Sequence, residues 1–213
     1  MEFRALIETE LIADARARSD GAASNGGFLS PAAILLLCLV IGLTFSFVVK
    51  ADDSSRINRV KTAFILNIAR FVSWPAEVLA DGSAEISLCL YRNNPIRQAI
   101  ESIAGEEVSG RRIVIKQLHS LTKNDACNIL LIGQDELQAY LSETQPDPNR
   151  PVLTIADLTD TDSHTHRHDG ILVTLIRNGA RIGFEINLQK TREVGLRMSS
   201  ELLKLAIIVG DDP

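Results

Sequence analysis

The sequence lacks the motifs that identify many enzymes. It contains no G-x-G-x-x-G or phosphate-loop spacing, so neither a dinucleotide site nor a nucleotide site is predicted. No nucleophile–base pair stands out either. The serine pair Ser199-Ser200 fits a helix N-terminus better, with Glu201 in the first turn. These absences indicate a recognition or sensor domain and not an enzyme.

Charge imbalance is also small. The 213 residues carry a formal net charge of -5, which provides no basic surface for nucleic acid. Internal repeats and low-complexity tracts are absent from the sequence. With 46% hydrophobic residues, the length suits one globular domain with an appendage.

A long uncharged segment lies near the N-terminus. No charged residue occurs between Gly21 and Val49, and residues 28–49 are almost wholly apolar. The end of this segment, Val49-Lys50-Ala51, fits the small-residue rule of a signal-peptide cleavage site. An uncleaved membrane anchor is the alternative, because about 20 apolar residues can span a bilayer. We therefore predict an N-terminal extension with a signal peptide or anchor over residues 1–51, and a single exported domain over residues 52–213.

Cysteine is scarce. Cys38 lies in the apolar segment, and removal of that segment leaves Cys89 and Cys127. An even count in an exported domain indicates one disulfide. The bridge would close a loop of roughly 39 residues and contribute about 4 kcal/mol in the chain-entropy model. Two buried free thiols are the alternative, because cysteine is among the most buried residue types. Export favours the bridge.

The apolar pattern predicts alternating helices and strands. We expect helices at 57–71, 95–104 and 134–143, strands at 85–91, 112–118, 127–132 and 152–155, and then a hairpin and two terminal helices. The hairpin turn is expected at Asn178-Gly179 as type I′. Together these elements predict an α/β fold: a mixed sheet with helices on both faces, an N-terminal helix, and a C-terminal β-hairpin at the sheet edge followed by helices.

The histidines and the single tryptophan are candidate binding residues. The residues His164, His166 and His168 alternate in a polar loop and could hold a soft divalent metal, although a solvated loop is the favoured interpretation. Trp74 precedes Pro75 at the end of the first helix. It is either a core anchor, which we favour, or a hot spot of an interface.

The strand after the hairpin turn has a polar face. Alternation is expected to bury the apolar residues Phe184, Ile186 and Leu188. Glu185 and Asn187 then point to the other face. Two roles are equally open for them. They bind a ligand or a partner, or they hydrogen-bond the start of the following helix.

Four segments resemble a known family. They are VKTAFILNIARFVSWP at 60–75, CNILLIG at 127–133, PVLTIADL at 151–158 and IGFEINLQKTREVGLRMSSELLKLA at 182–206. In this order they resemble the YfiR-like periplasmic proteins, which repress a membrane-bound diguanylate cyclase. Cys89 and Cys127 match a disulfide pair of that family, whereas a second bridge known in the family has no cysteines here.

The resemblance implies a specific regulatory role. It implies a domain in the periplasm of a Gram-negative bacterium that binds and represses the periplasmic domain of an inner-membrane diguanylate cyclase, and so controls cyclic-di-GMP and biofilm formation. A homodimer and sensitivity to redox conditions are implied as well, and no cofactor is expected. Two alternatives are a periplasmic small-molecule sensor acting on a histidine kinase, and a metal-binding protein that uses the histidine loop.

Overall fold

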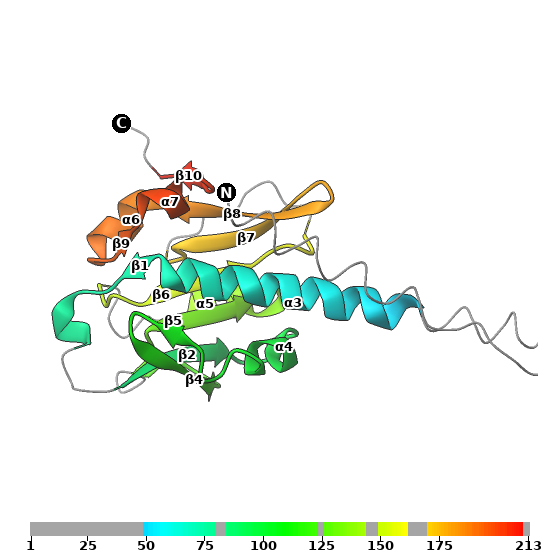
Figure 1. Cartoon of the computed structure of the whole chain (residues 1–213), viewed down its shortest axis with the longest axis horizontal. Coiled ribbons are helices and arrows are strands. Elements are labelled where there is room, and N and C mark those ends of the chain that lie inside the picture. Colours follow the sequence, from blue (N-terminus) through cyan, green and yellow to red (C-terminus); the bar gives the residue numbers. More distant parts are fainter. Residues whose placement is uncertain (1–48, 80–83, 123–125, 144–148, 162–169, 211–213) are drawn as a thin grey trace, which may run out of the picture. The chain divides into compact units, whose positions relative to one another are not determined.

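The computed structural model describes residues 49–79, 84–122, 126–143, 149–161 and 170–210 (Figure 1). The helices are α3 (Val49–Arg70), α4 (Arg97–Glu101), α5 (Leu137–Ser142), α6 (Leu188–Glu193) and α7 (Ser200–Leu203), with two 3₁₀ turns, η1 (Ala76–Val78) and η2 (Gln134–Glu136). A mixed sheet with helices on both faces confirms the predicted fold class.

One large sheet organises the described residues. Its strands are β2 (Glu85–Tyr91), β3 (Glu107–Val108), β4 (Arg111–Leu118), β5 (Ile129–Gly133), β6 (Leu153–Asp157), β7 (Val173–Asn178), β8 (Arg181–Asn187) and β10 (Ile207–Val209). Their spatial order is β10-β8-β7-β6-β5-β2-β4-β3. The β3–β4 and β7–β8 pairs are antiparallel, and the other neighbours are parallel. A separate antiparallel ribbon joins β1 (Val72–Ser73) to β9 (Arg197–Met198).

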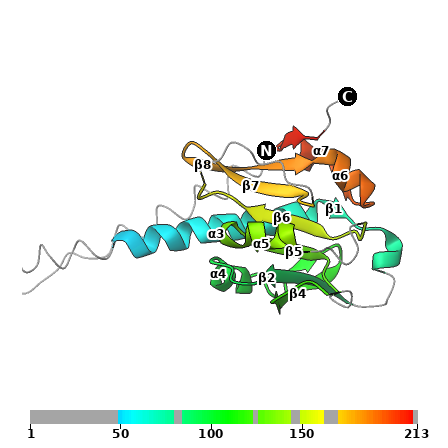
Figure 2. The same ribbon diagram turned by 180° about the vertical axis from the view of Figure 1, so that it is seen from behind.

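The central strands β2, β5 and β6 are buried on both faces. Alternate residues of β2, such as Leu88 and Cys89, belong to two different apolar clusters. The helices α3, α4, α6 and α7 contribute to the first cluster, and α5 covers the second (Figures 1 and 2). Parallel strands need this two-sided cover, because crossover helices lie on both faces of such a sheet.

The first helix is longer than predicted, and its buried stripe is rotated. It begins at Val49 and not at Ile57, and it ends at Arg70, before Pro75. The helical spacing of Ile57, Val60, Phe64, Ile68 and Phe71 predicts one apolar face, but Val60 and Phe71 are exposed. The buried positions are Lys61, Thr62, Ile65, Ile68 and Ala69. The predicted and observed buried faces differ because Lys61 lies on the inner face, whereas the sequence pattern assigns a lysine to solvent.

The predicted hairpin is present, but its turn lies one residue later. Asn178 pairs with Arg181, so Gly179 and Ala180 are the central turn residues. Gly179 has a φ of 60°, and it alone in this turn has a positive φ. A type I′ turn requires positive φ at both central positions, so the geometry is that of type II′, with glycine first.

The prediction that the hairpin forms the sheet edge is wrong. The short strand β10 pairs in parallel with β8 and lies outside the hairpin, with Val209 opposite Asn187. The sequence did not predict this three-residue strand, nor β1, β3 and β9. Each of them has two or three residues, too few for a periodic pattern. The 95–104 helix is also shorter than predicted, because α4 keeps five residues.

A substitution of Gly210 tests how β10 is held. Gly210 has a φ of 81°, and an added Cβ would lie 2.6 Å from the Asn187 side-chain oxygen. We expect Gly210→Ala to release β10 from β8, with a local destabilisation of about 1–2 kcal/mol from the positive φ alone. Amide hydrogen exchange of Ile208 and Val209 should rise. Gly183→Ala is the matched control, because its Cβ meets only Ile176 at 3.9 Å. Equal exchange in both variants would contradict the expectation.

Candidate functional site

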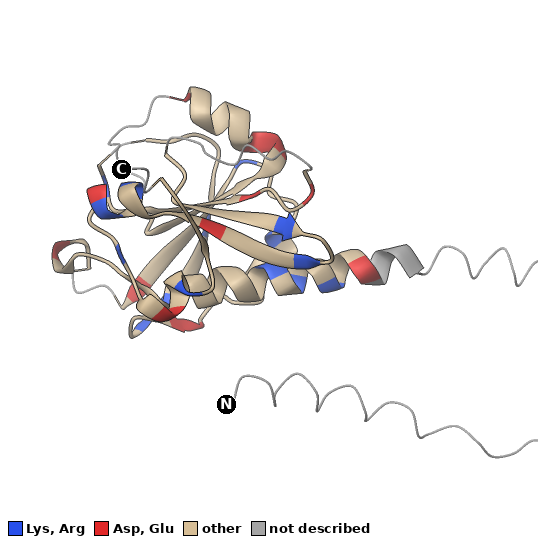
Figure 3. Cartoon of the chain, turned by 90° about the horizontal axis from the view of Figure 1, so that it is seen from above, with Lys and Arg blue, Asp and Glu red and all other residues tan. Residues whose placement is uncertain are grey.

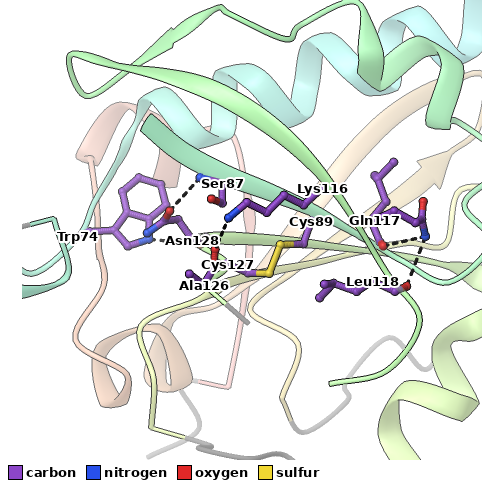
Figure 4. The surroundings of a disulfide bond; sticks show 10 residues. Trp74, Ser87, Cys89, Lys116, Gln117, Leu118, Ala126, Cys127 and Asn128 are labelled. Carbon is purple, nitrogen blue, oxygen red and sulfur yellow. Dashed lines mark hydrogen bonds between the residues drawn. A yellow bond between two sulfur atoms is a disulfide. The ribbon is translucent and has the colours of Figure 1, made fainter. Parts of the chain in front are cut away.

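The structure contains a disulfide between Cys89 and Cys127 (Figure 4). Cys89 lies in β2, and Cys127 lies just before the neighbouring strand β5. Their Cα atoms are 5.9 Å apart, within the usual range for a bridge. Both residues are buried in the apolar cluster under α5. The bond therefore joins two adjacent central strands inside the core.

Trp74 is brought close to this bridge by Asn128 (Figure 4). The indole Nε1 donates a hydrogen bond to the Asn128 carbonyl at 3.3 Å. The Asn128 side-chain oxygen in turn accepts from the Ser87 backbone N–H at 2.8 Å. Trp74 is buried and belongs to the first apolar cluster, so its side chain serves as a core anchor. Its alternative role as an interface hot spot stays a prediction.

Asn187 caps the helix that follows β8. Its side-chain oxygen accepts the backbone N–H of Lys190 at 3.0 Å, as an N-cap residue does. Glu185 is half-buried and lies opposite Thr174 on β7 and Ile207 on β10. Because three strands separate β8 from β2, these two residues lie away from the disulfide. The local role of Asn187 is visible in its capping bond, and ligand binding by either residue stays a prediction.

The predicted metal ligands His164, His166 and His168 lie outside the described residues. Among the residues that the structure does describe, no group of three or more metal-ligating side chains comes together. The histidine site therefore stays an untested prediction.

A buried lysine forms the strongest electrostatic feature at the carboxyl end of β6. Lys61 of α3 is only 2% exposed, and its ammonium lies 3.0 Å from Asp157 and 2.9 Å from Asp160. Asp157, the last residue of β6, is itself 5% exposed and also accepts the Thr159 hydroxyl at 2.7 Å. The second carboxylate on Lys61 and the two Thr159 donors on Asp157 offset part of the cost of burying this pair. In the sequence, Asp157, Asp160 and Asp162 form a cluster that indicates an ordinary turn, because aspartate is common in turns. The pattern gives no sign of the lysine that Asp157 and Asp160 share.

Arg177 extends this charged group to the surface. Its guanidinium donates to the Thr159 carbonyl at 2.9 Å and lies 3.2 Å from Asp160. The hydrogen bond from Lys61 is the main reason that the pKa of the Asp160 carboxyl is lowered, and Arg177 adds to this effect. The group ties α3 to the β6–β7 side of the sheet. Elsewhere acidic and basic residues are interspersed along the ribbon, as Figure 3 shows from above.

A second polar group lies under α5. Tyr91, at the end of β2, donates a hydrogen bond to the Glu143 carboxylate, which also accepts the Leu121 backbone N–H at 3.1 Å. Tyr140 packs edge-to-face on Tyr91 with ring centroids 5.6 Å apart. Burial raises the pKa of both phenols to about 12. A phenol is already protonated at neutral pH, so both hydroxyls act as hydrogen-bond donors there, and the raised pKa keeps them protonated in alkaline solution as well.

The C-terminal edge of the sheet exposes apolar side chains. Leu205 is 75% exposed, and Ile207 and Ile208 of β10 are exposed as well. We call residues 205–208 the apolar edge. Three of the five large exposed hydrophobic residues of the described chain are concentrated in these four positions. Clustered exposed apolar residues at an edge strand are typical of a surface that binds another protein.

Comparison with protein families finds a match for this chain. The model of the YfiR/HmsC-like family matches residues 58–207, which include Cys89, Cys127 and the strands of the large sheet from β2 to β8. No curated protein matches the chain. In addition, none of the described helices has the length and apolar character needed to cross a membrane.

Removing the disulfide should destabilise the domain. Its loop has a sequence separation of 38, so Cys127→Ser should lower the free energy of unfolding by about 4 kcal/mol in the chain-entropy model. Urea denaturation of the wild type and of the variant measures this difference. Cys89→Ser should give a similar loss, and the double variant should add little more. Identical unfolding of oxidised and reduced wild type would show that the bridge does not stabilise the domain.

Breaking the Lys61–Asp157 pair on one side should be costly. Lys61→Met leaves the Asp157 carboxylate buried without its cation, so we expect a loss of about 3–5 kcal/mol in urea unfolding. The double variant Lys61→Met/Asp157→Leu should recover most of that loss, because it removes both charges. Asp160→Asn is the control with a small effect, since Asp160 is 64% exposed.

The same variants should also differ in how their free energy of unfolding changes at acid pH. Because the pKa of Asp160 is lowered in the folded chain, its contribution is present above the unfolded value of 3.8 and lost as pH falls below it. Lys61→Met should flatten that acid-side decline. If Lys61→Met loses only as much stability as Asp160→Asn, and the double variant does not recover it, the buried pair has no special role in stability.

Proposed function

The chain belongs to the YfiR/HmsC-like family, and from this membership we propose that it represses an inner-membrane diguanylate cyclase by binding that enzyme's periplasmic domain. Membership in the family implies a periplasmic regulator of cyclic-di-GMP signalling. Repression would lower cyclic-di-GMP and so limit biofilm formation. The family match over residues 58–207 is the observation on which the proposal rests.

Repression by binding has a simple thermodynamic requirement. A bound regulator shifts a membrane enzyme toward an inactive state only if it binds that state more tightly than the active one. A shift from mostly active to mostly inactive requires a difference in affinity of about 10⁴-fold. The regulator itself then needs no catalytic residue. It needs a surface that fits one conformation of its partner.

The apolar edge is the surface that best fits a protein partner. Leu205 is 75% exposed, although burying a leucine side chain contributes about 1.5–3 kcal/mol. The outer side of β10 also presents the backbone groups of an edge strand, which an extended segment can pair with. We assign the apolar edge to the periplasmic domain of the cyclase. The homodimer expected from the family resemblance would then use another surface.

Two measurements test the proposal. Deleting the gene should raise cellular cyclic-di-GMP, because the cyclase loses its repressor. Leu205→Glu should raise it as well and weaken binding to the purified periplasmic domain by about tenfold or more, since it places a charge in an apolar contact. Val60→Glu is the matched control: Val60 is 42% exposed, apolar and on α3.

The outcomes distinguish the proposed repression of the cyclase from the proposed use of the apolar edge as the contact. Unchanged cyclic-di-GMP after gene deletion would refute repression. A rise after deletion with normal binding by Leu205→Glu would keep repression and exclude the apolar edge as the contact. If Leu205→Glu instead turns a dimer into a monomer and leaves binding of the cyclase domain intact, the edge joins two copies of this chain.

A further inference from the structure

A cleft of about 440 Å³ lies at the carboxyl ends of three parallel strands. Its walls are the loop after β2 at residues 92–95, Arg97 of α4, Gln117 and His119 around the end of β4, and Asp135 and Glu136 of η2 after β5. Its volume is within the range of small-molecule sites. None of the residues proposed from the sequence as a binding contact takes part in it.

The topology of the sheet explains why the cleft is there. After β2 the chain crosses to β4 through α4, whose Ile100 belongs to the first apolar cluster. After β5 it crosses to β6 through α5, whose Tyr140 belongs to the second cluster, on the opposite face. Because β2 and β5 are adjacent and parallel, the two connections leave a crevice at their carboxyl ends. Open α/β sheets bind ligands at this kind of switch point.

Two residues that line the cleft each carry a hydrogen-bond donor that is buried without a partner among the described residues. These donors are the Asn94 side-chain amide nitrogen Nδ2 and the Arg92 nitrogen Nε. Asn94 is only 9% exposed, and its oxygen is already engaged by the Ile96 backbone N–H at 3.1 Å. A buried unpaired donor costs about 1–3 kcal/mol. An acceptor from outside the chain would recover that free energy.

The loop that carries these donors is fixed in place. Arg92 has a φ of 47°, which is uncommon for a residue with a side chain. Its N–H donates to the Leu118 carbonyl at 2.7 Å, and its carbonyl accepts the Gln117 side-chain amide. At the end of β5, a Cβ on Gly133 would lie 3.2 Å from Pro95, so glycine allows the loop to approach closely. The donors are therefore held before any ligand arrives, which lowers the entropy lost on binding.

The charges of the cleft select the ligand. Arg92 and Arg97 are balanced by Asp135 and Glu136, and the Arg92 guanidinium lies 3.8 Å from the Glu136 carboxylate. A phosphate group with two negative charges would meet these carboxylates unfavourably. A planar group with one negative charge and two acceptor oxygens matches the planar guanidinium and amide donors. We propose that this cleft binds a small organic molecule through a single carboxylate group, held by Arg92 and Asn94.

Direct titration of the purified full chain tests this inference, and it needs no partner protein. The probes are acetate, butyrate and benzoate, with inorganic phosphate and sulfate at equal ionic strength. We expect saturable binding of at least one carboxylate by calorimetry. The side-chain amide resonances of Asn94 should shift in nuclear magnetic resonance spectra. Neither anion with tetrahedral oxygens should compete at the same concentration.

Two variants and a matched control locate the site. Asn94→Asp keeps the oxygen that holds the Ile96 N–H but replaces the free donor with an acceptor. Arg92→Lys keeps the charge and removes Nε. Each should weaken carboxylate binding by about tenfold or more, as expected for the loss of a charge-assisted bond. Asn178→Asp makes the same chemical change at an exposed turn and should leave binding unchanged.

Several outcomes would overturn the inference. If no carboxylate binds saturably, the cleft holds only water. If phosphate binds more tightly, the ligand class is wrong. Wild-type affinity in Arg92→Lys would exclude the cleft even if Asn94→Asp does not fold. Because the titration uses this chain alone, each of these results leaves the proposed repression of the cyclase untouched.

Discussion

The fold depends on the burial of β2, β5 and β6 on both faces. Six of the seven residues of β2, and every residue of β5 and β6, are buried. Two-sided burial demands helices on both faces, and it leaves no room within these strands for an unpaired polar side chain. Polar chemistry is therefore confined to the ends of the strands. Lys61 with Asp157, Tyr91 with Glu143, and the loop of Arg92 and Asn94 all lie at carboxyl ends of these strands.

This constraint also explains which parts of the fold could be predicted from the sequence. The strand at 85–91 has the predicted bounds, because its alternation encodes two different buried faces. The cap of Ser199 on α7 followed from local chemistry alone. By contrast, β10 exists only because β8 supplies a partner across the sheet, and its exposed isoleucines resemble the continuation of an apolar helix. Pairing over a long sequence separation leaves no local signal.

Some of the candidate sites could also be predicted from the sequence, and others could not. The disulfide was predictable, because two cysteines in the domain that the sequence predicts to be exported leave one pairing. Asn187 was predictable in its capping role, since a polar residue that ends a strand before a helix is a usual cap. Lys61 was not, because a lysine on an amphipathic helix is normally solvated and its partner Asp157 is nearly a hundred residues away. The cleft could not be predicted, because it depends on the order of the strands in the sheet, which no single segment specifies.

The apolar edge and the cleft lie in different parts of the sheet. The edge belongs to β10, the first strand in spatial order, whereas the cleft lies over β2, β4 and β5 beyond three intervening strands. A ligand in the cleft therefore makes no direct contact with a partner at the edge. Coupling between them requires a second arrangement of the intervening strands, with different affinity for each ligand. Strands packed on both faces resist such rearrangement, because close-packed cores deform little. Binding at one site should therefore be nearly independent of binding at the other.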